Sequence, residues 1–346
     1  MSKKVLVAMS GGVDSSVTAL LLLQQGWSVS GATFQLFDNG SQQNIADAKE
    51  VCDHLGIPHM VFDYHTAFSE KVLDYFADSY WAGETPNPCI ACNRAIKFGA
   101  FVQDAKRLGF THIATGHYAQ VFYHEAEKRW ALRQAQDLKK DQSYVLYHLS
   151  QEQLSMLLLP LEKYTKPQIR NLAAEAGLSV TSKSDSQDIC FIPDGNYPAF
   201  IERYTGIQSK PGDYLDENGC VIGRHQGVLH YTIGQRKGLG VSFGVHRYVS
   251  ALDAKKNTVT LSDESAVFSK RLEANDLQMI APVPSSKKLY AEVKIRYAHR
   301  PALAWIHFSD NGWVQVEFEQ PQRAVTKGQA AVFYHNGEVL GGATIR

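Results

Sequence analysis

Ala8-Met9-Ser10-Gly11-Gly12-Val13-Asp14-Ser15-Ser16 is the segment from which the architecture of this 346-residue chain is best deduced. It overlaps an apolar run, residues 5–9, that is typical of a buried strand, and it leads into a helical pattern over residues 17–25. Glycines at such a junction let the backbone approach a phosphate, and the N-terminus of the following helix attracts negative charge. The segment therefore predicts an anion-binding turn. It is not a Walker A loop, because it lacks the Gly-Lys-Ser/Thr ending. The alternative is an ordinary Gly-rich turn of an α/β domain.

Strand-like and helix-like segments alternate after this turn. Short apolar runs predict strands at 29–36, 58–64 and 111–115, and helical spacing predicts helices at 44–55, 68–81 and 94–108. Such alternation is typical of a doubly wound parallel sheet, whose ligands bind at the carboxyl ends of the strands. We therefore expect the turns after Met9 and Thr115 to lie at one edge of an α/β domain. Residues 118–133 predict a hairpin at the rim of that sheet.

The second half of the chain has a different character. From about residue 205, glycines and turn signals become frequent and the expected strands are short. From about residue 271, alternating runs such as Tyr290–Tyr297 predict a β-barrel. We therefore predict three domains, an α/β domain over residues 1–204, a small and mostly β central domain over 205–270, and a C-terminal β-barrel over 271–346.

The composition excludes several classes of protein. The 35 Lys and Arg residues are balanced by 35 Asp and Glu residues, so any nucleic-acid site must be a local patch. No apolar run approaches the roughly 20 residues of a membrane span, and the first residues lack the pattern of a signal peptide. The odd number of cysteines, five, argues against a secreted disulfide framework. We expect a cytoplasmic protein, without a membrane partner, whose cysteines are catalytic, redox-active or metal ligands.

Three of the cysteines are candidates for chemistry. Cys89 and Cys92 lie in a loop stiffened by Pro86 and Pro88, just before a predicted helix. Because a helix N-terminus lowers the pKa of a nearby thiol, we expect Cys92 to be a thiolate near neutral pH. A structural zinc site usually has two such cysteine pairs. This sequence has only one, which argues against structural zinc. Cys190 lies between a polar loop and an apolar run, where a cysteine is by itself more often a half-buried core residue.

The Ser-Gly-Gly-Val-Asp-Ser-Ser string resembles the PP-loop of ATP pyrophosphatases, which cleave ATP between its α- and β-phosphates. Together with other strings, it makes the chain similar to one family, the bacterial tRNA-specific 2-thiouridylases of the MnmA type. The resemblance implies an adenine nucleotide alpha hydrolase-like fold for the first domain and tRNA contacts for the barrel. The other strings are Thr85–Pro88, Cys92–Asn93, Ile96–Phe98, Ala114–Tyr118, Lys140–Tyr144, Asp185–Ser186, Ile189–Ile192, His225–Gly227, Gly234–Gly240, Arg296–Tyr297, Gly328–Gln329 and Ala331–Tyr334.

The resemblance implies a reaction on the wobble uridine of the tRNAs for Lys, Glu and Gln. ATP would adenylate the oxygen on C2 with release of pyrophosphate, and sulfur would then replace the activated oxygen as AMP leaves. Cys190 would carry a persulfide that a cysteine desulfurase or a sulfur-relay protein supplies. Cys92 would be the nucleophile that attacks this persulfide or closes a disulfide with Cys190 as sulfur leaves.

Further roles follow from the same resemblance. Asp14 would take part in catalysis and bind Mg²⁺, and the target base would be flipped out, because its reacting atom is otherwise inaccessible. Residues that would contact ATP are Ala8, Met9, Ser10, Gly11, Gly12, Val13, Asp14, Ser15, Phe34 and Gly116. Residues that would contact tRNA are Asn87, Pro88 and Cys89 at the target base, and His117, Lys140, Asp141, Gln142, Arg296, Tyr297 and Gln329 elsewhere.

One departure from the family leaves the sulfur carrier open. Many relatives have aspartate where this chain has Cys89, and that carboxylate is a candidate general acid or base. Cys89, Cys92 and Cys190 could instead hold an iron–sulfur cluster with one open iron that carries the sulfur. We favour the persulfide. The segment after Phe34 is also shorter than in typical members, which affects the expected contacts on the adenine side.

Two other functions compete with this interpretation. An amidotransferase of the PP-loop class would need an ammonia-generating domain or partner, and nothing in the sequence resembles a glutaminase. A non-catalytic tRNA-binding protein with a relic ATP site is disfavoured by the intact residues 10–16 and by the two cysteines. Lysine pairs such as Lys139–Lys140 and Lys287–Lys288 are most often solvated surface, and Gly234–Gly238 is equally compatible with a tight turn.

Overall fold

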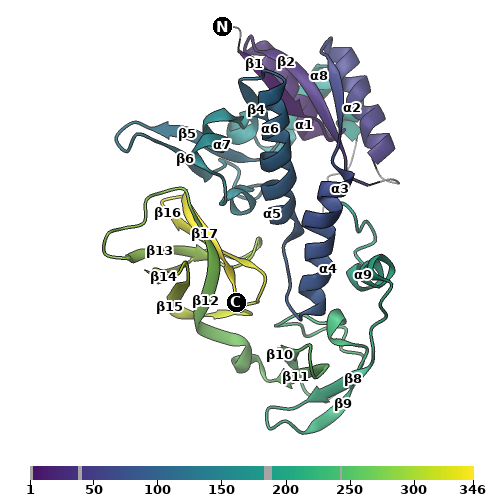
Figure 1. The fold of residues 1–346 in the computed structure, drawn as a ribbon, viewed down its shortest axis with the longest axis vertical. Helices are drawn as coiled ribbons and strands as arrows, with labels where there is room; N and C mark the ends of the chain where they lie inside the picture. The colour runs from purple at the N-terminus through teal and green to yellow at the C-terminus, as the bar shows by residue number, and fades with distance from the viewer. Residues whose placement is uncertain (1–2, 38–40, 183–188, 242–243) are drawn as a thin grey trace.

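The computed structural model describes residues 3–37, 41–182, 189–241 and 244–346, and the Asp185–Ser186 pair lies outside them. The described residues form three sheets (Figure 1). A parallel sheet with its helices lies at one end of the molecule, a four-stranded sheet lies at the other end, and a β-barrel lies beside them. This arrangement confirms the predicted fold class. No helix within the described ranges is long and apolar enough to cross a membrane.

The parallel sheet has the strand order β3-β2-β1-β4-β7. β1 pairs in parallel with β2 on one side and with β4 on the other, so the direction of winding changes between β1 and β4. Ligands of doubly wound sheets bind at this switch point, beyond the carboxyl ends of the strands. The strands are β1 (Lys4–Ala8), β2 (Ser28–Gln35), β3 (His59–Asp63), β4 (His112–Ala114) and β7 (Leu157–Leu158).

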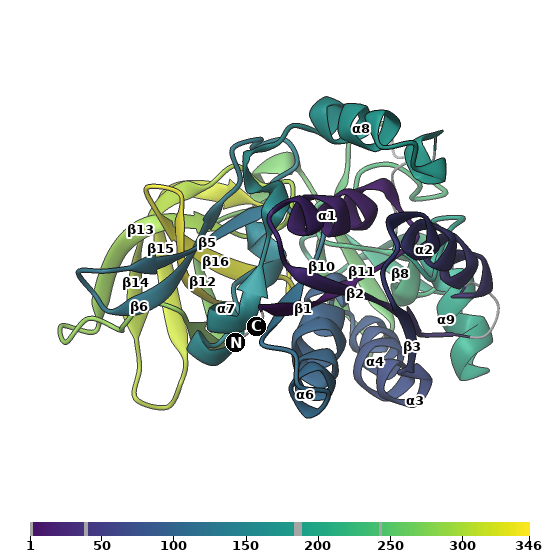
Figure 2. The same ribbon diagram turned by 90° about the horizontal axis from the view of Figure 1, so that it is seen from above.

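Helices cover both faces of this sheet (Figure 2). The first face carries α1, α2 and α8, and the opposite face carries α3, α4 and α6 (Phe101–Arg107). The strands are apolar on both sides for this reason, since Val5 and Val7 pack in one core cluster and Leu6 in the other. The helical segments are α1 (Val13–Gln24), α2 (Ser41–Leu55), α3 (His65–Phe68), η1 (Ser69–Leu73), α4 (Asp74–Trp81), α7 (Gln151–Met156), α8 (Lys166–Glu175), η3 (Ser143–Leu146), η4 (Pro160–Lys163), η5 (Ser179–Ser182) and α9 (Tyr197–Thr205).

One helix begins earlier than the sequence predicted. It runs continuously as α5 (Pro88–Cys92), a π-helical stretch η2 (Asn93–Ala100) and α6 (Phe101–Arg107). The Asn87 side chain caps it by accepting hydrogen bonds from the N–H groups of Cys89 (3.1 Å) and Ile90 (3.3 Å), and Pro88 stands in the first turn, where no N–H is needed. Cys89 and Cys92 therefore lie inside a helix, and the expected loop location was wrong.

The central region contains a small sheet with the order β10-β11-β8-β9. Its core is formed by Tyr214, Val249, Val259 and Leu261, all fully buried. The strands are β8 (Gly212–Leu215), β9 (Val221–His225), β10 (Tyr248–Asp253) and β11 (Thr258–Ser262), and the short helices are η6 (Val228–His230) and η7 (Glu264–Val267).

The C-terminal region is a closed antiparallel barrel, because β12 pairs with β15 at one edge and with β17 at the other. Along β14, Ala304, Ile306 and Phe308 are buried while their neighbours are more exposed, which is the period-two alternation expected of a barrel strand. The strands are β12 (Phe268–Met279), β13 (Lys288–Lys294), β14 (Ala302–Phe308), β15 (Val314–Arg323), β16 (Ala330–His335) and β17 (Glu338–Ile345).

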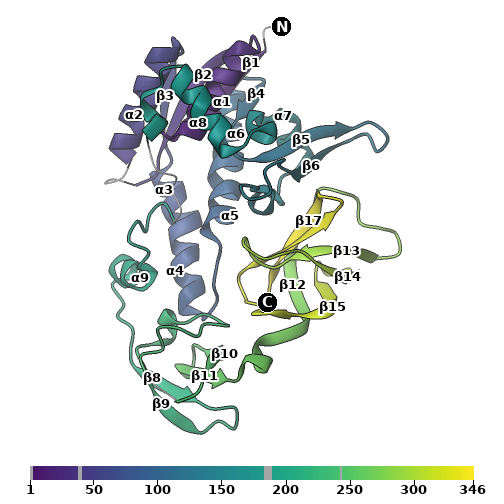
Figure 3. The ribbon, with the colours of Figure 1, turned by 180° about the vertical axis from the view of Figure 1, so that it is seen from behind.

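The predicted hairpin is present as β5 (Ala119–His124) and β6 (Arg129–Gln134), directly after β4, but the sequence did not predict its second partner. β6 also pairs with β17 of the barrel, where Leu132 lies opposite Val339. Figure 3 shows the hairpin extending over the end of the barrel at which β17 lies. The edge of β17 beyond its barrel partners offers unpaired backbone groups, and the hairpin satisfies them. The first domain and the barrel therefore share one continuous sheet.

Candidate functional site

The turn between β1 and α1 has the geometry of an anion cradle. Gly11 has a φ of +69°, and a Cβ there would lie 2.8 Å from the carbonyl oxygen of Asn44, so a larger residue would be both strained and crowded. The Ser10 N–H donates to Ser15 Oγ at 3.1 Å, which fixes the turn against the helix. Gly12 is the N-cap of α1, and as a glycine it has no side chain with which to cap this helix. The first turn of α1 is therefore suited to accept a phosphate.

Gly116 follows β4 and approaches the same turn. A Cβ on Gly116 would lie 2.9 Å from the carbonyl carbon of Asp14 and 2.9 Å from the Ser15 nitrogen. Only glycine allows this approach. The two turns that were expected to share the carboxyl edge of the sheet are thus in contact at the switch point between β1 and β4.

The carboxylate of Asp14 is held by two side chains from other parts of the chain. Lys166 Nζ lies 2.8 Å from each of its oxygens, and the Tyr118 hydroxyl donates to Oδ1 at 2.7 Å. Lys166 is buried, in the first turn of α8. Sequence reasoning missed Lys166, because Thr165, Pro167 and Gln168 around it explained the segment as a helix start. The one available signal was a lysine placed where a helix N-terminus disfavours positive charge.

These residues fit ATP with Mg²⁺ only in part. The helix N-terminus at Gly12 and the two close glycines fit a phosphate, and Asp14 is a carboxylate of the kind that Mg²⁺ binds. No group of three or more acidic, His or Cys side chains among the described residues is arranged to hold a metal. A magnesium ion at Asp14 would have to take ligands from the nucleotide and water, as Mg²⁺ usually does.

Phe34 lies at the carboxyl end of β2, on the same edge of the sheet. Its half-buried ring packs edge-on against Phe101 (4.8 Å between centroids) and Tyr64 (5.3 Å). The predicted contact of Phe34 with ATP stays a prediction, together with those of the other residues of the turn.

The cysteine helix brings three thiols into one neighbourhood. Cys92 is buried in α5. Cys89 in the same helix is exposed, and so is Cys190, in the segment that begins at residue 189. The thiols of Cys89 and Cys190 are close enough to affect the pKa of Cys92 electrostatically. All five cysteines are free, so the disulfide expected during sulfur transfer is not formed in this structure. The three candidate cluster ligands are likewise not arranged around a common metal position.

The pKa of Cys92 shifts in the direction opposite to our expectation. Burial raises it to about 12, and nearby Lys97 opposes this rise. Cys92 is the last residue of α5 and continues into η2, so it does not benefit from a helix N-terminus. Burial also raises the pKa of Cys190, even though Cys190 as a residue is exposed. The predicted Cys92 thiolate near neutral pH is therefore wrong for the protein without its substrates.

Lys97 is a second residue that sequence reasoning did not select. It is half-buried in η2, and its charge lowers the pKa of Cys92, of Cys190 and of His117. Residues five apart lie on nearly the same side of a π-helix, so Lys97 and Cys92 share a face. Lys97 is thus placed to stabilise negative charge on sulfur.

Several expected tRNA contacts are used inside the protein. The buried Asp141 accepts hydrogen bonds from Ser143 Oγ (2.8 Å) and from the N–H of Ala135 (3.1 Å), and the Gln142 side chain accepts one from the Tyr118 N–H (3.0 Å). The buried His117 bonds to Thr115 Oγ1 at 2.7 Å. These side chains first of all shape the loop, and their contacts with tRNA stay predictions.

The other expected tRNA contacts are more accessible. Tyr297 is 44% exposed although its hydroxyl donates to the Asp141 carbonyl at 3.0 Å, and the half-buried Arg296 bonds to the Arg323 carbonyl at 2.9 Å. Lys294 lies over the Tyr297 ring at 5.4 Å. Lys140 is half-buried, and its expected role is untested by the geometry.

The segment that leads into the cysteine helix is held by both other domains. The Thr85 N–H donates to the Lys327 carbonyl (2.8 Å), and Gln329 Nε2 donates to the Thr85 carbonyl (2.7 Å). The Thr85 hydroxyl reaches that of Thr232 in the central region at 3.4 Å. The barrel and the central domain therefore set the position of Asn87, Pro88 and Cys89 through Thr85.

Comparison with known proteins identifies three family models on this chain. They are described as a tRNA methyl transferase HUP domain over residues 3–194, a tRNA methyl transferase PRC-barrel domain over 198–263, and an aminomethyltransferase beta-barrel domain over 269–345. These ranges follow the parallel-sheet domain, the small central sheet and the closed barrel.

Relatives are similar along the whole chain. The chain is 45% identical to the tRNA-specific 2-thiouridylase MnmA of Acetivibrio thermocellus, with 99% of each protein covered. It is 48% identical to that of Heliobacterium modesticaldum, covering 100% of this chain and 93% of the relative. It is 47% identical to that of Carboxydothermus hydrogenoformans, covering 99% and 97%.

Proposed function

The chain belongs to the family of tRNA-specific 2-thiouridylases, and we propose that it is an ATP-dependent sulfurtransferase that converts the wobble uridine of the tRNAs for Lys, Glu and Gln to 2-thiouridine. One observation carries this proposal, the physical link between the anion cradle and the cysteines. Gly116 packs against Asp14, and the next residue, His117, lies 6.0 Å from the ring of Phe98, in the helix of Cys92. Activation by ATP and sulfur transfer would therefore take place at adjoining sites.

In the first step, the C2 oxygen of the uridine attacks the α-phosphorus of ATP, and the bond to the β-phosphate breaks with release of pyrophosphate. The N–H groups at the start of α1 would bind phosphate oxygens, and Asp14 would hold Mg²⁺, which would neutralise charge on the phosphates. The ammonium of Lys166, which lies beside the Asp14 carboxylate, would offset the negative charge that develops on the leaving pyrophosphate. The reaction needs this step because a carbonyl-type oxygen is a poor leaving group and AMP is a good one.

In the second step, the terminal sulfur of a persulfide on Cys190 attacks C2 and displaces AMP. The thiolate of Cys92 then attacks the inner sulfur, the S–S bond to the uridine breaks, and the electron pair of that bond stays on the 2-thiouridine. The product is a disulfide between Cys92 and Cys190, which a thiol reductant must open before the next turnover. The persulfide itself comes from a cysteine desulfurase or a sulfur-relay protein. An iron–sulfur cluster on Cys89, Cys92 and Cys190 is the competing sulfur carrier.

The test is thiolation of an unmodified tRNA(Lys) transcript by metal-free protein, supplied with ATP, Mg²⁺ and a desulfurase with cysteine. The product is read from its retarded migration on a mercury-containing gel. We expect a shifted band that disappears with Cys92→Ala and with Cys190→Ala. A band that appears only after anaerobic addition of iron and sulfide would replace the persulfide by a cluster. No band under either condition would reject the proposed function.

A further inference from the structure

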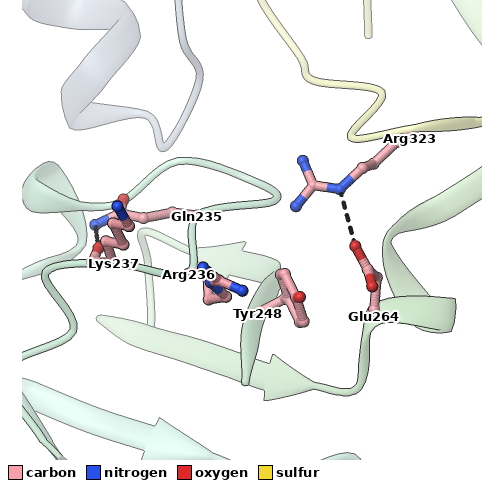
Figure 4. Close-up of a pocket in the computed structure, with 6 residues that line it drawn as sticks. All are labelled: Gln235, Arg236, Lys237, Tyr248, Glu264 and Arg323. Atoms are coloured by element: carbon pink, nitrogen blue, oxygen red, sulfur yellow. Dashed lines mark hydrogen bonds and ion pairs between the residues drawn. The ribbon is translucent and has the colours of Figure 1, made fainter. Parts of the chain in front are cut away.

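The turn Gly234–Gly240 of the central region forms one wall of a cavity of about 530 Å³ that reaches across to the barrel (Figure 4). The cavity is lined by Gln235, Arg236, Lys237, Tyr248, Glu264 and Arg323. We propose that this cavity binds a phosphodiester of the RNA substrate and thereby extends the RNA-binding surface from the barrel onto the central domain. The inference rests on the proposed function, since it names a second contact with the same RNA.

The charge of the cavity favours an anion. Arg236, Lys237 and Arg323 contribute three positive charges, and Glu264 contributes one negative charge. Arg236 and Lys237 are exposed, and within the described residues neither makes an ion pair. The protein as a whole has a formal net charge of zero, so this excess is local. A local cationic cluster of this kind is how a neutral protein attracts a phosphate backbone.

Arg323 is held in place at the centre of this cluster. Its Nη2 donates to the Gly234 carbonyl at 3.0 Å, its Nε lies 3.6 Å from Glu264, and its guanidinium lies 5.5 Å from the centre of the Tyr248 ring. Figure 4 shows it pointing across the cavity toward Glu264 and Tyr248. A guanidinium fixed in this way loses little conformational entropy when it binds, and its planar donors match two phosphate oxygens.

The turn itself is shaped to face the barrel. Gly234 has a φ of +85°, and a Cβ there would lie 2.6 Å from the Cβ of Ala324 on the barrel. Glycine is therefore required for the close approach, which places the following Arg236 and Lys237 beside Arg323. The tight turn that the sequence indicated is present, and it carries cations into a cavity.

RNA is favoured over a free anion by continuity with the barrel. The Arg323 carbonyl accepts a hydrogen bond from Arg296 at 2.9 Å, and Arg296 adjoins the exposed Tyr297. Basic and exposed aromatic side chains in sequence along a surface suit a polynucleotide, which offers both phosphates and stacking faces. The central domain and the parallel sheet lie at opposite ends of the molecule (Figure 1), so one ligand that reaches both must be extended.

The experiment compares two double charge reversals in the central domain. The double variant Arg236→Glu, Lys237→Glu removes the proposed contact. The matched control is Lys255→Glu, Lys256→Glu, in the turn that follows β10, whereas Tyr248 of the cavity is at the start of that strand. Dissociation constants for a full-length tRNA transcript are measured by filter binding at several salt concentrations, and ATP binding by each variant verifies the fold. We expect the cavity variant to bind tRNA about 10- to 100-fold more weakly near 0.1 M salt, with a salt slope smaller by about 1 to 2.

Two results would overturn the inference. If the cavity variant and the control bind tRNA equally well, the cavity does not hold RNA. If the cavity variant binds tRNA normally but thiolates it only with sulfide and not with the desulfurase, the cavity receives an acidic sulfur-donor protein instead. A failure of the proposed function is distinct from both, because the unmodified protein would then not thiolate tRNA under any of the conditions above, whether or not it binds tRNA.

Discussion

Lys166 Nζ lies 2.8 Å from both carboxylate oxygens of Asp14, across 152 residues of sequence. Both groups are at helix N-termini, Asp14 in the first turn of α1 and Lys166 in the first turn of α8. The positive end of the helix dipole stabilises the Asp14 carboxylate and destabilises the Lys166 ammonium. The ion pair with Asp14 offsets this unfavourable interaction of Lys166. The pair fixes the one acidic side chain of the phosphate turn.

Lys166→Ala is therefore expected to slow pyrophosphate release by about 10- to 100-fold, because Asp14 loses the partner that orients it. The rate is measured with saturating tRNA at several ATP and Mg²⁺ concentrations. Lys163→Ala is the matched control, since Lys163 is 73% exposed and pairs with Glu162 at 3.6 Å. Equal rates for the two variants would show that the ion pair has no part in the reaction.

Cys89→Ala separates the two sulfur carriers. With a persulfide on Cys190, the variant is expected to keep thiolation within about fivefold of the unmodified protein, because Cys89 is not a partner in either bond exchange. With a cluster, the variant loses one of three ligands and thiolation is abolished. Thiolation is read on the mercury gel, and Cys220→Ala, an exposed cysteine of the central region, is the control.

The parts of this structure that the sequence predicts are those encoded over short distances. The β1 strand, the Gly11–Gly12 turn and the start of α1 follow one another directly, and the Thr165–Gln168 capping box is likewise local, with the Thr165 N–H bonded to Gln168 at 2.8 Å. Apolar periodicity and glycine placement are sufficient to predict such elements.

The parts that were missed depend on tertiary contacts. The pairing of β6 with β17 joins segments about 200 residues apart, and no local pattern specifies it. We expected a low pKa for Cys92 because it precedes a predicted helix start, but burial of the thiol raises its pKa instead. Burial of one residue depends on what packs over it, which local sequence does not report.

The raised pKa of Cys92 predicts an unusual pH dependence. With a pKa of about 12, the thiolate fraction is about 10⁻⁴ at pH 8, so alkylation by iodoacetamide is expected to accelerate about tenfold per pH unit up to pH 10. The rate is followed by peptide mass spectrometry, with Cys220 as an exposed internal control. Lys97→Met is expected to slow alkylation of Cys92 at every pH, since it removes the charge that lowers this pKa. A rate for Cys92 that levels off below pH 9 would contradict the burial argument.

His148 makes the fold sensitive to acid. Burial, with a smaller contribution from the charge of Arg94, lowers the pKa of His148 to about 3, and it outweighs the opposing effects of Asp276 and of a backbone hydrogen bond at Asn93. Since an unfolded histidine has a pKa of about 6.5, the unfolded chain binds one more proton at this position between pH 6.5 and pH 3. The free energy of unfolding is therefore unaffected by His148 above pH 6.5, where the histidine is neutral in both states. It decreases progressively as the pH falls from 6.5 toward 3.

His148→Phe is therefore expected to reduce the slope of the free energy of unfolding against pH by up to about 1.4 kcal/mol per pH unit between pH 6 and pH 4. Phenylalanine keeps a ring of similar size beside Tyr147, whose ring centroid lies 5.7 Å away, so the packing changes little. Urea unfolding at each pH supplies the measurement, and His335→Phe, at an exposed position, supplies the control. Burial also lowers the pKa of His117, and it lowers the pKa of His299 to about 4. The free energy of unfolding of the variant therefore still depends on pH through these two histidines. Equal slopes for His148→Phe and His335→Phe would contradict the prediction, because they would show that His148 contributes nothing to the pH dependence of the free energy of unfolding.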